Sequence, residues 1–163
     1  MRWEVIISTR KEEIYELWHK EKKLLTLDFH PATNSARIDH ADEKRVFLIR
    51  REGFLKNKTV LCNEYGIRLG QLLYENKETY IELNHERFFY AIQNEPKNRI
   101  IIYKESIDQP LVVCALNITK VSTSIKPNKD KIEPINALSS LLLALSWFIL
   151  QPVVKDKVSD YAV

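Results

Sequence analysis

The chain has 163 residues, of which 45% are hydrophobic and 29% charged, and a formal net charge of +3. This length suits one domain, and the balance of apolar and charged residues argues against a disordered chain. Only three glycines occur, which argues against a glycine-rich phosphate loop. The small basic excess falls short of the footprint of a nucleic-acid-binding protein, so we expect no nucleic acid among the partners.

The N-terminal stretch MRWEVIISTRKEEIYELWHK has charged residues throughout and lacks the continuous apolar segment of a secretory signal peptide. We therefore expect a cytoplasmic protein. The two cysteines, Cys62 and Cys114, lie far apart in strand-like segments, where buried reduced thiols are the simpler interpretation. A disulfide between them stays open.

Residues 1–123 read as one strand after another. In LLTLDFH the apolar residues Leu25, Leu27 and Phe29 alternate with polar ones, and a period of two is typical of a half-buried strand. Turn-forming residues recur about every 8 to 12 positions, which indicates an antiparallel barrel or sandwich. No helical pattern separates the strands, so a parallel α/β sheet is not expected. The segment VSTSIK is a candidate for a last short strand.

The pattern changes after a polar linker. The segment ALSSLLLALSWFILQPVV, residues 137–154, carries no charge and shows no alternation. It is hydrophobic nearly all round, so as a helix it must be surrounded by apolar material. Pro134 suits the first helical turn, Asn136 is a candidate cap and Pro152 is expected to end the helix, which together predict a helix over 134–151.

Two hypotheses explain this segment. About twenty helical residues span ~30 Å, enough for a bilayer, so the chain could be a tail-anchored membrane protein with a cytosolic β domain. Alternatively the helix fills a barrel, because a closed barrel of roughly ten strands has an interior that its own side chains fill poorly. The second hypothesis is favoured, since one burial event satisfies both elements.

We therefore predict a mainly β fold. It is expected to be an antiparallel closed β-barrel of about 10–12 strands around a C-terminal hydrophobic α-helix. The whole chain, 1–163, is expected to form this single domain, with 134–151 as the buried central helix.

The pattern resembles a known family. The stretch RVFLIRREGFLKNKTVLCNEYGIRLGQLLYE, followed by RFFYAI, RIIIYKES, LVVCALN and LLLALSWFIL, is similar to the tubby C-terminal-like fold that LURP-one-related proteins and phospholipid scramblases share. Asn63-Glu64-Tyr65-Gly66 and Leu69-Gly70-Gln71-Leu72 match its short turn and the strand that follows. The likeness covers residues 14–150. It implies a barrel around a helix and a non-enzymatic binding or scaffold module, and tubby itself binds phosphoinositide head groups at membranes.

A group of cations surrounds the expected turn at Gly53. These are Arg50, Arg51, Lys56 and Lys58, and mobile cations suit phosphate oxygens and anionic lipid surfaces. We predict that they bind anionic phospholipid head groups, which would associate the protein with a membrane. The alternative is that these charges, with Glu52 among them, serve only solubility. A second group, Lys126, Lys129 and Lys131, precedes the helix.

Two acid–histidine segments could hold a divalent metal. They are Asp28-Phe29-His30 and Asp39-His40-Ala41-Asp42, on neighbouring expected strands. A solvated polar face explains them more simply, so we expect no cofactor and no catalytic residue. A small metal-dependent enzyme using His30 and His40 remains an alternative. Cys62 with His85 as a thiol nucleophile is disfavoured, because Cys62 lies in an apolar run.

Overall fold

The computed structural model describes residues 1–40, 43–52, 58–75, 78–94, 98–117 and 137–159, and the structural statements that follow concern these ranges. Eleven strands and one helix lie in them. In chain order they are β1 (Arg2–Ser8), β2 (Glu13–His19), β3 (Lys22–His30), β4 (Ser35–His40), β5 (Glu43–Glu52), β6 (Lys58–Asn63), β7 (Arg68–Glu75), β8 (Glu78–Leu83), β9 (Glu86–Gln93), β10 (Arg99–Tyr103), β11 (Pro110–Asn117) and α1 (Ala137–Ser159).

The strands form one closed barrel in which sequence neighbours pair antiparallel. Because eleven is odd, the first and last strands of such a meander run in the same direction, and β1 pairs β11 parallel from Arg2↔Ala115 to Glu4↔Asn117. The Met1 ammonium extends this junction by donating to the Val113 carbonyl at 3.1 Å. All odd-numbered strands therefore finish at the same end of the barrel, which we call the odd-strand end.

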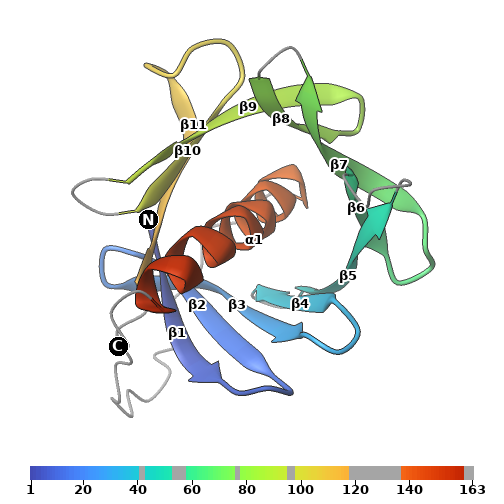
Figure 1. Cartoon of the computed structure of the whole chain (residues 1–163), viewed down its shortest axis with the longest axis vertical. Coiled ribbons are helices and arrows are strands. Elements are labelled where there is room, and N and C mark those ends of the chain that lie inside the picture. The colour runs from blue at the N-terminus through green and yellow to red at the C-terminus, as the bar shows by residue number, and fades with distance from the viewer. Residues whose placement is uncertain (41–42, 53–57, 76–77, 95–97, 118–136, 160–163) are drawn as a thin grey trace.

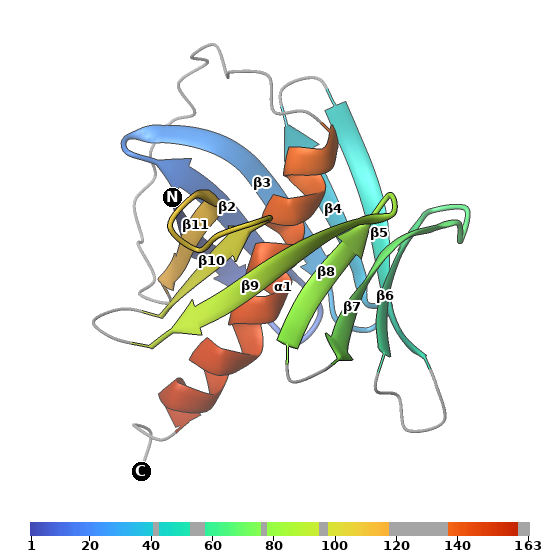
Figure 2. The ribbon, with the colours of Figure 1, turned by 90° about the horizontal axis from the view of Figure 1, so that it is seen from above.

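The helix α1 lies inside the barrel (Figure 1). Ser140–Trp147 are all buried, and this run covers more than two helical turns, so every side of the helix faces protein. Its C-terminal turns emerge from the barrel (Figure 2). The predicted mainly β barrel around a C-terminal helix is confirmed, with eleven strands in the described ranges.

Trp147 is the largest helix side chain in the core and is fully buried. Its ring lies 4.9 Å from that of Tyr15 on β2 and 5.0 Å from that of Phe29 on β3, measured between centroids. Tilted aromatic pairs at this separation are favourable beyond the area that they bury. One tryptophan thus joins the helix to two neighbouring strands.

The buried Ser146 of the helix finds hydrogen-bond partners inside the barrel. The Ser146 hydroxyl donates to the Leu143 carbonyl at 2.6 Å and accepts from the Trp3 indole at 3.2 Å. These two contacts satisfy a hydroxyl that would otherwise be costly to bury.

A second polar group lies where the helix leaves the barrel. The Glu13 carboxylate, 6% exposed, accepts from the Tyr15 hydroxyl at 2.6 Å and from the Gln151 amide at 2.7 Å. Burial raises the pKa of Tyr15, and its hydrogen bond to Glu13 raises it further. The three side chains link β2 to the last buried turn of α1.

The turns agree with their sequences. The Asn63 side chain accepts from the N–H groups of Tyr65 and Ile67, and Gly66 takes φ +79°, which glycine adopts without steric cost. The two-residue turn between β8 and β9 has positive φ at both Asn84 and His85, the geometry of a type I′ hairpin.

The expected end of the helix at Pro152 is wrong, because α1 continues to Ser159. Proline removes one backbone hydrogen bond from a helix interior. Pro152 is exposed just beyond the buried segment, and the hydrogen bond that it cannot make is the one to the Phe148 carbonyl, in the last buried turn. Pro134, Asn136 and the strand expected at VSTSIK lie outside the described residues.

Among the helical residues within the described ranges, no segment has both the length and the apolar character required to cross a bilayer.

The first prediction concerns Leu143, which is 4% exposed inside the barrel. Leu143→Lys places an unpaired charge in an apolar interior, so we expect it to lower the free energy of unfolding by about 4 kcal/mol. The matched control is Leu111→Lys on β11, where the side chain is 53% exposed and the change should cost little. Urea denaturation measures both. Equal midpoints for Leu143→Lys and the parent would contradict burial of the helix.

The second prediction concerns Tyr15. Tyr15→Phe removes a hydrogen bond to a buried carboxylate, so at neutral pH we expect a loss of about 1–3 kcal/mol. The pKa of Tyr15 is raised above its ordinary value of 10.0, so its contribution to stability is fully present below pH 10 and declines as the pH rises further. The difference between parent and variant should therefore narrow above pH 10. Denaturation curves at several pH values test this, and a constant difference would refute it.

Candidate functional site

The interior of the barrel is occupied by its own helix. The buried residues Leu141–Leu145 and Trp147 face strands on all sides, whereas ligand-binding barrels keep this space for a small molecule. The surfaces left for contact with another molecule are the outer face of the strands and the ends of the barrel.

The predicted basic residues lie on one hairpin. Arg50 and Arg51 end β5, and Lys58 begins β6, with Arg51 opposite Thr59 and Glu52 opposite Lys58 in the register. The side chains of Arg50, Arg51 and Lys58 are all exposed. The structure thus places three of the four predicted cations on one hairpin, where the pleat puts Arg51 on the opposite face from Arg50 and Lys58. Lys56 lies outside the described residues.

Glu52 lies opposite Lys58 but forms its ion pair with another residue. Its carboxylate accepts from the Arg68 guanidinium at 2.7 Å, an ion pair that joins β5 to β7 across β6. Within the described ranges no acidic group forms an ion pair with Arg50, Arg51 or Lys58. We call these three residues the basic hairpin. Its positive charge faces solvent.

The odd-strand end gathers further cations. Arg10 and Lys11 lie in the turn after β1 and are exposed, and Arg99 begins β10 and hydrogen-bonds the neutral Gln93 amide at 2.6 Å. Tyr74, near the end of β7, is 72% exposed at the same end. Sequence reasoning missed this grouping, because only the alternating strand directions place turns so far apart in the chain at one end. Lys126, Lys129 and Lys131 lie outside the described residues.

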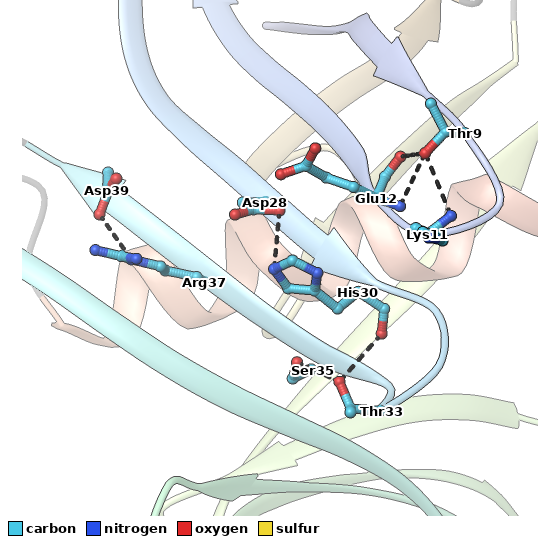
Figure 3. A network of polar contacts seen from close by, with 9 residues as sticks. All are labelled: Thr9, Lys11, Glu12, Asp28, His30, Thr33, Ser35, Arg37 and Asp39. Carbon is cyan, nitrogen blue, oxygen red and sulfur yellow. Dashed lines mark hydrogen bonds and ion pairs between the residues drawn. The ribbon is translucent and has the colours of Figure 1, made fainter.

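The two predicted histidines do not share a pocket. His30 projects from the outer face of β3 beside Asp28, with 3.4 Å between its Nε2 and the Asp28 Oδ1 (Figure 3). His40 is buried on the inner face of β4, together with Ala36 and Ile38, and its Nδ1 hydrogen-bonds the Leu24 carbonyl at 2.8 Å. The pleat of the sheet therefore separates them.

A third acidic residue joins Asp28 and His30. Glu12, in the turn before β2, brings a carboxylate oxygen to them, and one donor atom from each residue lies within 4.8 Å of the other two. Sequence reasoning missed Glu12, because it lies 16 positions before Asp28 in an ordinary charged turn. The register of β2 and β3, with Glu13 opposite Phe29, creates this proximity.

Asp39 and Asp42 are the remaining acidic candidates. Asp39 faces Arg37 on the same strand, with 3.5 Å between its Oδ1 and the Arg37 Nε (Figure 3). That cation already compensates the carboxylate. Asp42 lies outside the described residues.

The cysteines are free and buried. Cys114, on the inner face of β11, has its pKa raised to about 11 by burial, with a smaller opposing effect of Ser146, so it stays a neutral thiol near pH 7. Cys62 is 3% exposed, and His85 stands in the exposed turn after β8. Nothing in the described contacts prepares either thiol as a nucleophile.

A shallow polar depression of about 140 Å³ lies on the outer face of β7 and β8. Gln71 and Glu82 hydrogen-bond each other within it at 3.1 Å, and Arg68, Asn84 and His85 contribute to its walls. Ordinary small-molecule sites enclose about 300–1,000 Å³, so this depression is too small to hold one.

No protein-family model, no curated protein and no solved structure matches this chain.

Proposed function

We propose that the protein is a non-enzymatic binding module of the tubby-like class that recognises anionic phospholipid head groups through the basic hairpin. The observation that carries this proposal is the exposure of Arg50, Arg51 and Lys58 on one hairpin, with Glu52 engaged elsewhere. Lys56, in the same turn by sequence, belongs to the proposed site. Its cellular place would be the cytoplasmic surface of a membrane.

The exposed cations and one exposed aromatic side chain support a lipid surface as the partner. An arginine guanidinium can donate two parallel hydrogen bonds to a phosphate group, and a lysine ammonium adds a point charge. Arg10, Lys11 and Arg99 add positive charge at the same end of the barrel. The exposed ring of Tyr74 suits the interfacial layer of a bilayer, where amphipathic aromatic side chains are favoured.

The architecture supports the tubby-like interpretation. A barrel closed around a hydrophobic C-terminal helix is the layout that the sequence resemblance implies. Because this helix fills the interior, binding through surface cations is more plausible chemistry for the fold than enclosure of a ligand. The tail-anchor hypothesis would instead require α1 to leave the barrel and Trp147 to lose its contacts with Tyr15 and Phe29.

The third prediction tests the basic hairpin. Arg50→Glu, Arg51→Glu and Lys58→Glu combined should weaken binding to liposomes containing anionic lipid by about 100-fold or more, since each surface cation contributes roughly 1 kcal/mol. Sedimentation with liposomes at low salt measures the affinity. Parent binding should weaken as salt increases, because exposed charges are screened over ~10 Å at 0.1 M.

A matched control separates the hairpin from net charge. Lys20→Glu, Lys22→Glu and Lys44→Glu change the charge equally at the opposite end of the barrel. This control should retain most of the binding. The proposal is wrong if the parent does not prefer anionic to neutral liposomes, or if both triple variants lose binding equally.

A further inference from the structure

We propose that Glu12, Asp28 and His30 form a binding site for a divalent first-row transition cation of the Zn²⁺ type. The site lies on the outer face of β3 at the odd-strand end, and Figure 3 shows its three side chains. It combines two carboxylate oxygens with one imidazole nitrogen. Neither the barrel nor the proposed lipid binding depends on it.

The distances suit a metal ion. Two ligand atoms bound at about 2.1 Å to a tetrahedral ion lie about 3.4 Å apart, and 3.4 Å separates the His30 Nε2 from the Asp28 Oδ1. The Glu12 oxygen completes a group in which all three donor atoms lie within 4.8 Å of one another.

The Asp28 oxygen lacks a hydrogen-bond donor. Its Oδ1 is shielded from solvent and accepts no hydrogen bond from the described residues, because the contact with His30 does not have hydrogen-bond geometry. A shielded carboxylate oxygen without a donor is costly. Coordination of a cation would satisfy it.

The charge of the group also favours a dication. Glu12 and Asp28 bring two negative charges, and neither forms an ion pair with a lysine or arginine within the described ranges. Asp39, on the neighbouring strand, also has a shielded oxygen, but Arg37 stands beside it. Arg37 also lies opposite Asp28 in the register of β3 and β4, but the ion pair that it forms is with Asp39, so neither Glu12 nor Asp28 has a lysine or arginine at ion-pair distance within the described ranges.

The backbone around the donors is held in place. The Thr9 hydroxyl accepts from the N–H groups of Lys11 and Glu12 and donates to the Glu12 carbonyl, which fixes the turn that carries Glu12. Beyond β3, the Thr33 hydroxyl contacts the His30 carbonyl and the Ser35 hydroxyl. Two hydrogen-bonded turns therefore position ligands that come from separate parts of the chain (Figure 3).

The donor set selects the class of ion. Imidazole suits zinc, copper, iron and nickel, whereas magnesium and calcium prefer oxygen ligands alone. The His30 side chain is 47% exposed, so the remaining coordination positions of a bound ion would be open to water. We therefore expect Zn²⁺ to bind at least 100-fold more tightly than Mg²⁺.

The fourth prediction is tested by calorimetric titration of the untagged full-length chain with ZnCl₂. We expect one equivalent to bind, and the single variants Glu12→Gln, Asp28→Asn and His30→Ala to weaken binding at least tenfold. The matched controls Asp39→Asn and His19→Ala should bind as the parent does. Circular dichroism verifies that each variant is folded.

A second measurement needs no variant. The chain has four histidines, so Zn²⁺ titration followed by NMR of the imidazole nitrogens should shift the resonances of His30 and leave those of His19, His40 and His85 in place. Failure of the parent to bind Zn²⁺ below about 100 μM, unchanged binding by folded site variants, or shifts at another histidine alone would each overturn the proposal. Equal affinities for Zn²⁺ and Mg²⁺ would also overturn it.

Discussion

The burial of α1 inside the barrel is the contact on which the other parts of the structure depend. Trp147 packs between Tyr15 and Phe29, and Ser146 receives the Trp3 indole, so strands from the beginning of the chain contact a helix from its end. A barrel of eleven strands without this helix would have a large empty interior. Because the interior is filled, the chemistry available to a partner lies on the outer face and at the ends.

The strands and the helix could be predicted from the sequence because each has an unambiguous pattern. In β3 the apolar Leu25, Leu27 and Phe29 alternate with polar residues, whereas the core residues of α1 form a continuous apolar run. The end of the helix could not be predicted, since local sequence rules treat Pro152 as a stop. They do not show that it stands exposed at the mouth of the barrel, where the helix can continue past a proline.

The candidate sites show a similar limit. The grouping of the basic hairpin was predictable because its residues are close in sequence. The proximity of Asp28 and His30 was predictable for the same reason. Glu12 was not, since only the pairing of β2 with β3 brings it near them. The separation of His30 from His40 also follows from the pleat, because the two side chains project from opposite faces of the sheet. Residues from different turns meet only once strand direction and register are known.

The parallel junction between β1 and β11 constrains the order in which the chain can fold. Met1 contacts Val113 across 112 positions, and this junction pairs only three residues on each strand. Contacts so distant in sequence form late, because the entropy of closing the intervening loop must be overcome first. During synthesis the strands emerge before α1, so the open meander exposes its apolar face until the helix is available. The strands therefore cannot bury their apolar face until α1 has been synthesised. We expect chaperones to bind the chain mainly before α1 becomes available.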